Sequence, residues 1–176
     1  MSEVSFKHKM VAPSKVNVMV ITCSSSRYKI KKETGRIDDP SGDLIVNMLS
    51  EKGHKILDRK LIPDNKLMIK NTLKKALKKK DLDAIVITGG TGISKKDLTI
   101  EVAKKIVEKD LPGFGELLRK ISYEKIGSAA MLTRAFAGIA KNKAIFCIPG
   151  SPNAVEIALK ELIMPEILHI VKHIKE

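Results

Sequence analysis

The chain has 176 residues, of which 43% are apolar and 30% charged, and its 33 Lys and Arg against 20 Asp and Glu give a formal net charge of +13. This length suits one domain with a core that needs no disulfide or structural metal, and the composition excludes a disordered protein. No apolar run approaches the roughly 18 residues of a membrane span, and the N-terminus lacks the apolar segment of a secretory signal. Cys23 and Cys147 lie far apart with no CxxC neighbour, which excludes a disulfide scaffold and a cysteine zinc site. We therefore expect a cytoplasmic protein with an anionic partner, for which nucleic acid, anionic lipid and phosphorylated small molecules all qualify.

The excess positive charge lies mainly in residues 1–80, which hold 19 cations and 8 anions, whereas residues 81–176 hold 14 cations and 12 anions. Seven lysines and no acid occur in Lys66–Lys80. Apolar residues recur there at helical spacing: Ile69, Leu73, Ala76 and Leu77. The favoured interpretation is a packed surface helix with a solvated lysine face. The alternative is a surface for nucleic acid or anionic lipid, although no aromatic side chain in this stretch could stack bases. Many lysines and no glutamine also resemble the composition of a thermophile's protein.

Short β-branched runs alternate with amphipathic stretches along the chain. In chain order they predict a strand at Val16–Thr22, a helix at Ser41–Lys52, a strand at His54–Leu61, a helix at Asn65–Lys80, a strand at Ala84–Thr88, helices at Leu98–Lys109 and Gly115–Glu124, a strand at Ala144–Ile148, a helix at Asn153–Ile163 and a last helix from Pro165. Residues 132–139 fit a helix or a strand. Near-continuous hydrophobic strands between helices indicate an α/β fold with a mostly parallel sheet covered on both faces. We expect a polar N-terminal arm over residues 1–14 and a single domain over residues 15–176.

The loops that follow the strands are candidate sites, because ligands of open parallel sheets bind outside the carboxyl ends of the strands. The most informative of them is Thr88–Ser94, with the sequence TGGTGIS. Glycine has no Cβ, so successive backbone N–H groups of such a loop can converge on an anion, and a following helix would add positive charge from its N-terminus. The loop predicts a phosphate site, with a tight strand-to-helix turn as the alternative. Its candidate residues are Thr88, Gly89, Gly90, Thr91, Gly92 and Ser94.

Two carboxylates accompany this loop. Asp97 follows Ser94 by three residues, so it either completes a capping box with Ser94 or holds a magnesium ion against a phosphate. Asp64 precedes the lysine helix and could be its N-cap, but its loop is predicted to lie at the same edge of the sheet. There the two carboxylates could share a metal ion.

Other polar residues near strand ends have two interpretations each. Ser151, after Pro149 and Gly150, either caps the next helix or provides a second phosphate contact. Ser41 and Gly42 offer the same choice at an earlier helix, where a cap is favoured.

Two arginines and two histidines remain as candidates. Arg27, in the polar loop Ser24–Arg27, could bind a phosphate bidentately, and a flexible loop is the alternative. Arg134 could bind substrate or form an ion pair. His169 and His173 are four residues apart on the last helix and could share a metal ion, but without an HExxH glutamate an exposed helix face is the favoured interpretation.

Together these segments resemble the molybdopterin-binding family that includes the MoaB and MogA proteins of molybdenum cofactor biosynthesis. The resemblance covers roughly Lys15 to Ile167. It is carried by Thr88–Ser94 (TGGTGIS) followed by Asp97-Leu98-Thr99, by Pro112–Arg119 (PGFGELLR), by Ile126–Gly138 (IGSAAMLTRAFAG), by Ile148–Pro152 (IPGSP) and by Asp39–Gly42 (DPSG). Phe114–Arg119 and Ser122–Gly127 resemble the MoaB branch more than the MogA branch.

The resemblance implies a three-layer α/β/α fold around a mixed five-stranded sheet with one antiparallel strand, and a homo-oligomer, either a trimer or a dimer of trimers. It implies a molybdopterin adenylyltransferase of molybdenum or tungsten cofactor biosynthesis, with Mg²⁺ and ATP and without a permanently bound cofactor. In this reaction the terminal phosphate of molybdopterin attacks the α-phosphate of ATP, pyrophosphate leaves and adenylated molybdopterin forms. The metal-insertion protein of the same pathway is the expected partner, and neither a membrane nor nucleic acid is implied.

Residue by residue, the resemblance makes Asp64 and Asp97 the catalytic residues, which position magnesium and the nucleotide. It assigns phosphate binding to Gly89–Ser94 and the pterin side to Ser128 and Pro149–Ser151. Further substrate-binding candidates in matching motifs are Thr99, Glu116 and Arg134. Two alternatives stay open: a non-catalytic molybdopterin-binding or scaffold protein that uses the same pocket, and a nucleic-acid or anionic-surface binder that uses Lys66–Lys80.

Overall fold

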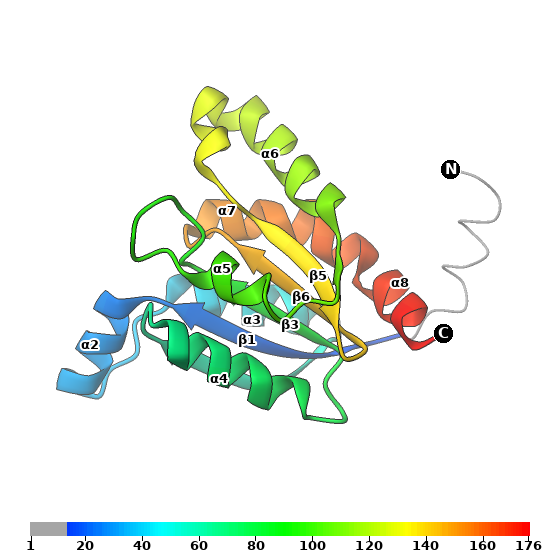
Figure 1. Ribbon diagram of the computed structural model, residues 1–176, viewed down its shortest axis with the longest axis horizontal. Coiled ribbons are helices and arrows are strands. Elements are labelled where there is room, and N and C mark those ends of the chain that lie inside the picture. The colour runs from blue at the N-terminus through cyan, green and yellow to red at the C-terminus, as the bar shows by residue number, and fades with distance from the viewer. Residues whose placement is uncertain (1–13) are drawn as a thin grey trace.

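The computed structural model describes residues 14–176, so the predicted arm of residues 1–14 lies, but for Ser14, outside the described residues. Within them, six strands form one sheet in the order β2-β1-β3-β6-β5-β4. The strands are β1 Asn17–Cys23, β2 Lys55–Ile62, β3 Ala84–Thr88, β4 Lys109–Asp110, β5 Phe136–Ala140 and β6 Lys143–Ile148. Strands β1, β2, β3 and β6 are parallel, β5 runs antiparallel to β6, and β4 runs antiparallel to β5. The predicted mostly parallel, mixed sheet is confirmed (Figure 1), but the expected number of five strands is wrong, because β4 adds a sixth.

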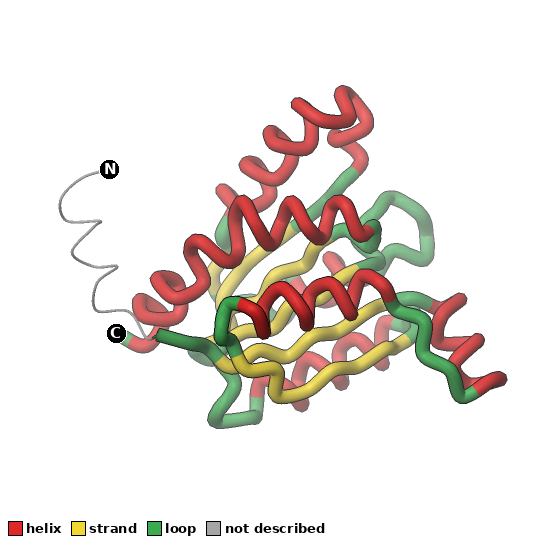
Figure 2. Tube along the Cα trace, turned by 180° about the vertical axis from the view of Figure 1, so that it is seen from behind, coloured by secondary structure: helices red, strands yellow, loops and turns green. Residues whose placement is uncertain are grey.

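Helices cover both faces of the sheet and make the predicted three layers. They are α2 Ser25–Thr34, α3 Pro40–Glu51, α4 Lys66–Leu77, α5 Thr99–Ala103, α6 Pro112–Ile126, the 3-10 helix η1 Gly127–Leu132, α7 Pro152–Ile157, the π-helix η2 Ala158–Ile163 and α8 Met164–Lys175. Along β1, Val18 and Val20 pack in the core under α3 and α7–α8, whereas Met19 and Ile21 pack in the core under α4 and α5. Figure 2 looks onto the first of these faces.

The sixth strand lies in a segment that the sequence analysis predicted as helix. The predicted helix Leu98–Lys109 is wrong in its second half, because α5 ends at Ala103. Beyond α5, the N–H of Glu108 donates to the carbonyl oxygen of Ile139 at 2.8 Å, and the two-residue strand β4 follows. Pairing with β5 therefore determines the backbone here, against the helical pattern of the sequence. Residues 132–139, which fitted either type, contain the start of β5.

Helix α2 forms where the sequence analysis expected a polar loop. Ser24 is its N-cap and accepts the N–H of Arg27 at 3.4 Å, and Gly35 ends it at φ +71°. None of the residues of α2 is buried. The segment therefore lacks the apolar periodicity by which a helix is recognised in a sequence.

Helix α4 confirms the packed surface helix predicted for the lysine-rich segment. Its apolar positions are buried in the core: Ile69, Leu73, Ala76 and Leu77. The lysines of α4 lie on its exposed side. Nowhere in residues 14–176 is there a helix that combines the length and the apolar character needed to cross a membrane.

Candidate functional site

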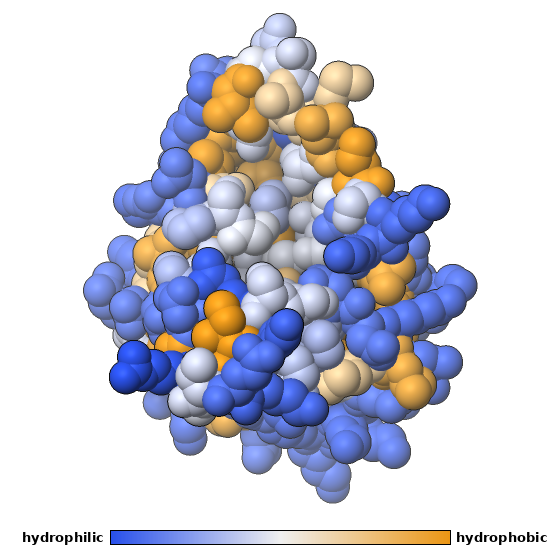
Figure 3. Space-filling model, turned by 90° about the vertical axis from the view of Figure 1, so that its left-hand side faces the viewer, coloured by the Kyte–Doolittle hydropathy of each residue, from blue (hydrophilic) through white to orange (hydrophobic). Residues whose placement is uncertain are grey.

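The carboxyl ends of the four parallel strands meet at one edge of the sheet. Cys23 at the end of β1 pairs with Ile62 at the end of β2, and Thr88 at the end of β3 pairs with Ile148 at the end of β6. The loops that follow these strands therefore converge, as the sequence analysis predicted. Figure 3 looks onto this edge, where weakly polar residues occupy the middle of the surface.

The glycine loop, defined as residues 89–98, leaves β3 through two residues with left-handed backbones, Gly89 (φ +90°) and Gly90 (φ +64°). A Cβ on Gly89 would lie 2.3 Å from the carbonyl oxygen of Cys23. A Cβ on Gly90 would lie 2.4 Å from Oγ1 of Thr99. The chain can make this turn only with glycine at both positions.

Protein donors hold the carbonyl oxygens of the glycine loop. Oγ1 of Thr99 donates to the carbonyl of Gly89 at 2.8 Å, and the N–H of Thr99 donates to that of Gly90 at 3.0 Å. Nε of Arg134 donates to the carbonyl of Gly92 at 2.7 Å. In a trans peptide the C=O and the following N–H point in opposite directions. The N–H groups that follow these carbonyls therefore point away from Thr99 and Arg134.

Two buried threonines brace the loops from below. Thr88 and Thr99 are both completely buried. Oγ1 of Thr88 donates to the carbonyl of Pro149 at 2.8 Å and so links the end of β3 to the loop after β6. Both threonines thus act on the shape of the loops.

Asp64 lies against the glycine loop and is not the N-cap of α4. Asn65 takes that place, since its Oδ1 accepts two backbone N–H groups of the first turn, both at 3.0 Å. Oδ2 of Asp64 accepts the N–H of Ser25 at 2.8 Å and its hydroxyl at 2.9 Å. Oδ1 lies beside Gly90, 3.3 Å from where a Cβ would stand. The carboxylate is thereby held in place by α2 and directed at the loop.

Asp97 lies against the same loop, beside Gly92. Its Oδ2 accepts the N–H of Ser94 at 2.8 Å and lies 3.0 Å from where a Cβ of Gly92 would stand. Burial alone would raise the pKa of Asp97, but hydrogen bonds from Ser94 and Gly92 and the charge of Arg134 outweigh burial and lower it. Helix α5 begins only at Thr99, so Ser94 and Asp97 close a turn inside the loop. The interpretation of this pair as a helix capping box is wrong.

Arg134 attaches the glycine loop to the segment before β5. Besides Gly92 it binds the carbonyl of Asp97 through Nη2 at 3.1 Å, and its Nη1 forms an ion pair with Glu101. The hydrogen bond from Arg134 lowers the pKa of Glu101. The ion-pair interpretation of Arg134 is confirmed, and the guanidinium also shapes the loop.

Replacing Arg134 with lysine should loosen the loop, because an ammonium group cannot reproduce the planar fork that joins two carbonyls and a carboxylate. We expect pyrophosphate, used as a probe of the loop, to bind at least about fivefold more weakly, and the free energy of unfolding to fall by about 1–2 kcal/mol. Titration calorimetry and urea unfolding measure the two effects. The control is Arg36→Lys, because Arg36 is exposed in the loop between α2 and α3 and is not a candidate site residue; equal losses in both variants would contradict the role of Arg134.

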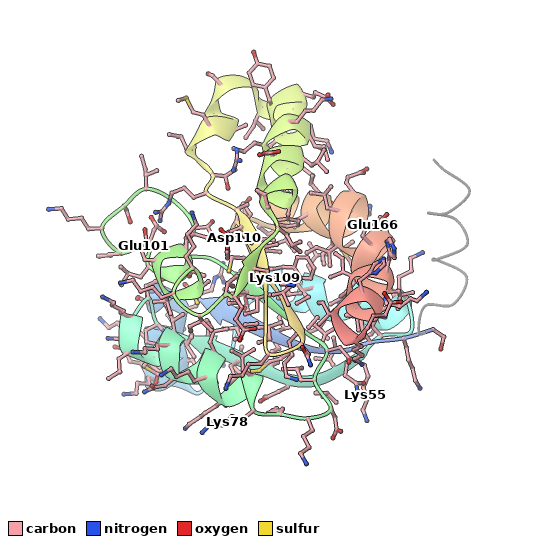
Figure 4. All side chains as sticks on the ribbon, turned by 45° about the vertical axis from the view of Figure 1, so that its right-hand side comes forward. Lys55, Lys78, Glu101, Lys109, Asp110 and Glu166 are labelled. Carbon is pink, nitrogen blue, oxygen red and sulfur yellow. The ribbon has the colours of Figure 1, made fainter. Side chains whose placement is uncertain are left out.

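A cavity of about 530 Å³ adjoins the glycine loop, because Arg134, which donates to the carbonyl of Gly92, also lines the cavity together with Glu101. Glu116 and Arg119 of α6 and Asp110 of β4 also line it. Figure 4 labels Glu101 and Asp110 near this cavity. Glu116 therefore belongs to the site as a residue that lines the cavity, and not as a residue of the glycine loop.

Several predicted residues prove to be caps or braces. Oγ of Ser151 caps α7, and the hydroxyl of Ser41 donates to the carbonyl of Gly150 at 2.7 Å. The N–H of Gly42 donates to Oδ1 of Asp39, the N-cap of α3, at 3.0 Å. The cap interpretation favoured for the start of α3 is confirmed.

Two residues predicted for the site, Arg27 and Ser128, have neighbours outside the glycine loop. The guanidinium of Arg27 forms an ion pair with the carboxylate of Asp38 at 3.0 Å. Ser128 lies in η1 and lines a separate hollow of about 360 Å³ together with Tyr123 and Met131.

Ser25 is a residue of the site that the sequence analysis did not single out. Its N–H and hydroxyl donate to Asp64, and its Oγ accepts the N–H of Asp64 at 2.9 Å. Its position directly after β1 could have indicated it, because the loops that follow the parallel strands are the expected place for a ligand.

The cysteines supply no nucleophile. Burial raises the pKa of Cys23, which lies under the glycine loop, to about 12, and burial also raises that of Cys147. Neither thiol ionises near neutral pH, so both serve as core residues.

A family model described as a probable molybdopterin binding domain matches residues 19–169. The chain belongs to this family. It is 44% identical over 169 residues to the "Probable molybdopterin adenylyltransferase" of Methanocaldococcus jannaschii, covering 96% of this chain and 99% of that protein. It is 42% identical to "Molybdenum cofactor biosynthesis protein B" of Bacillus cereus, covering 93% of this chain and 94% of that protein. The crystal structure of the tungsten cofactor synthesizing protein MoaB from Pyrococcus furiosus superposes with a TM-score of 0.82 at 41% identity, covering 94% of this chain and all of the other.

In this molybdopterin-binding domain, the motifs that suggested the family lie in two adjoining places. The segment Thr88–Ser94 and Asp97 lie at the carboxyl edge of the sheet, and Pro112–Arg119 forms the first half of α6 beside the cavity. Arg134 connects the two places. The similarity to proteins named MoaB confirms the branch that the sequence resembled.

Proposed function

We propose that this chain transfers AMP from ATP to molybdopterin, giving adenylated molybdopterin and pyrophosphate in molybdenum or tungsten cofactor biosynthesis. The observation that carries the proposal is that two carboxylates, Asp64 and Asp97, lie against one glycine loop, beside Gly90 and Gly92. Relatives of nearly the same length that are named molybdopterin adenylyltransferase support it.

The chain's contribution to this reaction is positioning and charge neutralisation, because both substrates bring phosphate groups. The outward N–H groups of the glycine loop would bind phosphate oxygens of the nucleotide. The terminal phosphate of molybdopterin then attacks the α-phosphorus, and the bond to pyrophosphate breaks. The cavity lined by Glu116 and Arg119 has a volume suited to the pterin.

Asp64 and Asp97 fit a magnesium ion that arrives with the nucleotide. Magnesium prefers oxygen ligands and is usually held by one or two carboxylates plus substrate phosphates. Within residues 14–176 there is no group of three or more His, Cys, Asp or Glu that could hold a metal by itself, so substrate phosphates and water would supply the remaining ligands. Bound there, Mg²⁺ would neutralise charge on the phosphates. The pKa of Asp97 is lowered by its hydrogen bonds, so its carboxylate is ionised at neutral pH, as a magnesium ligand must be.

The proposal is tested by incubating the purified chain with molybdopterin, ATP and Mg²⁺ and analysing the pterin by mass spectrometry. We expect the mass of adenylated molybdopterin together with release of pyrophosphate. Tight binding of molybdopterin without a gain in mass would instead establish the non-catalytic alternative. If neither occurs, the proposed function is wrong.

We propose that the chain works as a homo-oligomer and passes its product to the metal-insertion protein of the pathway. Exposed apolar and aromatic side chains gather at the tip formed by α6 and η1, where Figure 3 shows several groups of orange atoms at the top of the molecule. They are Leu117, Tyr123, Ile126, Met131 and Leu132, and Met131 is 76% exposed. Such a patch on a water-soluble surface is typical of an interface.

Replacing Met131 with glutamate should therefore shift the chain toward monomers, because burial of a carboxylate in an apolar interface is unfavourable. We expect the molar mass measured by size-exclusion chromatography with light scattering to fall to that of a smaller oligomer or of the monomer. The matched control is Ile37→Glu, an exposed apolar residue away from the tip. An unchanged mass for Met131→Glu would contradict an interface at this tip.

A further inference from the structure

Two histidines of α8 face each other in an arrangement that the proposed function does not use. Nε2 of His169 lies 2.7 Å from Nε2 of His173. The side chains are 23% and 47% exposed, so solvent reaches the pair. An exposed helix face, which the sequence analysis favoured, describes their position but gives no reason for this close contact between two ring nitrogens.

Each ring also has a carboxylate at its other nitrogen. Nδ1 of His169 lies 3.3 Å from Oε2 of Glu166, and Nδ1 of His173 lies 2.9 Å from Oε2 of Glu176. Glu166 is labelled on α8 in Figure 4. A carboxylate at Nδ1 favours the tautomer that carries its proton there, which leaves the lone pair on Nε2. Where both rings carry their proton on Nδ1, two lone pairs face each other at 2.7 Å, and a cation bound by both nitrogens removes the repulsion between them.

We propose that His169 and His173 bind a divalent late transition-metal ion of the Ni²⁺ and Cu²⁺ class. With metal–nitrogen bonds of about 2.0–2.1 Å, a separation of 2.7 Å gives an angle of roughly 80° at the metal, near that of adjacent ligands in square-planar or octahedral coordination. Tetrahedral zinc would need the nitrogens about 3.3 Å apart. Among residues 14–176 no third His, Cys, Asp or Glu completes a cluster with the pair, so this part of the chain supplies two nitrogen ligands. The ion would join two successive turns of the C-terminal helix.

The test is titration calorimetry of the full-length, untagged chain with NiCl₂ in a buffer that does not chelate metals. We expect one Ni²⁺ per chain. His169→Gln and His173→Gln should each weaken binding at least about tenfold, because a single imidazole cannot chelate. Glu176→Gln, which removes the carboxylate from Nδ1 of His173, should also weaken it, by roughly tenfold. Far-ultraviolet circular dichroism checks that each variant keeps its helices.

The matched control is Glu156→Gln, a glutamate of α7 that pairs with Lys160 four residues on, and its Ni²⁺ affinity should equal that of the wild type. Equal affinity of the wild type and His169→Gln would overturn the proposal. So would absence of Ni²⁺ binding, with the two rings sharing a proton instead, or tighter binding of Zn²⁺ than of Ni²⁺. AMP transfer plays no part in these measurements, so their failure leaves the proposed function standing.

Discussion

Asp97→Asn is expected to abolish AMP transfer while leaving the fold intact. The amide keeps an oxygen that can accept the N–H of Ser94, so the turn inside the glycine loop survives. The lost negative charge removes half of the proposed magnesium-binding pair with Asp64. Metal-assisted charge neutralisation contributes several kcal/mol to such a transition state, so we expect the rate to fall by roughly 10²–10³-fold or more. Pyrophosphate release with molybdopterin, ATP and Mg²⁺ measures it.

The control for this variant is Asp58→Asn, because Asp58 lies on β2 and pairs with Lys79 at 2.8 Å, an interaction with no part in the loop. Its rate should stay within about twofold of the wild type, since a partly exposed ion pair contributes little. Unchanged turnover in Asp97→Asn would rule out a role for this carboxylate in the reaction.

The acidity of Asp97 adds a second readout for the same variant. Its pKa is lowered in the folded protein, so the ionised group contributes stability above its unfolded pKa of about 3.9 and loses that contribution as the pH falls through the folded pKa. Asp97→Asn lacks the contribution at every pH. The difference in free energy of unfolding between wild type and variant should therefore shrink as the pH falls below about 4, measured by urea unfolding.

The sequence predicted those features of the fold and site that follow from hydrophobic patterning and sheet topology. The strand Ala84–Thr88 was predicted with its observed bounds, because all five residues are buried between two helical layers and turn residues follow directly. The rule that parallel strands end at one edge of the sheet predicted that Asp64 lies at the same edge as the glycine loop and Asp97.

The remaining features depend on contacts between distant segments, which one sequence does not reveal. Asp64 and Asn65 are adjacent and both are good N-cap residues, and only the structure shows that Asn65 caps α4 and leaves Asp64 to the site. Strand β4 has two residues and exists because β5 is there to pair with it. Arg134 had to be placed beside Gly92, 42 residues away, before its role in the loop was visible.

Gly90→Ala is expected to have the largest effect on the shape of the site. An alanine held in a left-handed backbone conformation lowers the free energy of unfolding by about 1–2 kcal/mol, whatever surrounds its side chain. At Gly90 the new Cβ would also lie 2.4 Å from Oγ1 of Thr99. That hydroxyl cannot retreat, because Thr99 is fully buried and donates to the carbonyl of Gly89. The loop must therefore move, away from the positions in which its N–H groups would bind phosphate.

Gly35→Ala separates the two causes. Gly35 has a similar backbone, φ +71° against +64°, but a Cβ there would meet nothing within 4 Å. We expect Gly35→Ala to lose only the backbone contribution of about 1–2 kcal/mol and to transfer AMP at the normal rate. Gly90→Ala should lose about 2–4 kcal/mol and at least tenfold in rate, measured by urea unfolding and pyrophosphate release. If both variants lost the same stability and kept the same rate, the close approach of Gly90 to Thr99 would have no part in shaping the site, and the loop would tolerate a side chain where the structure leaves no room for one.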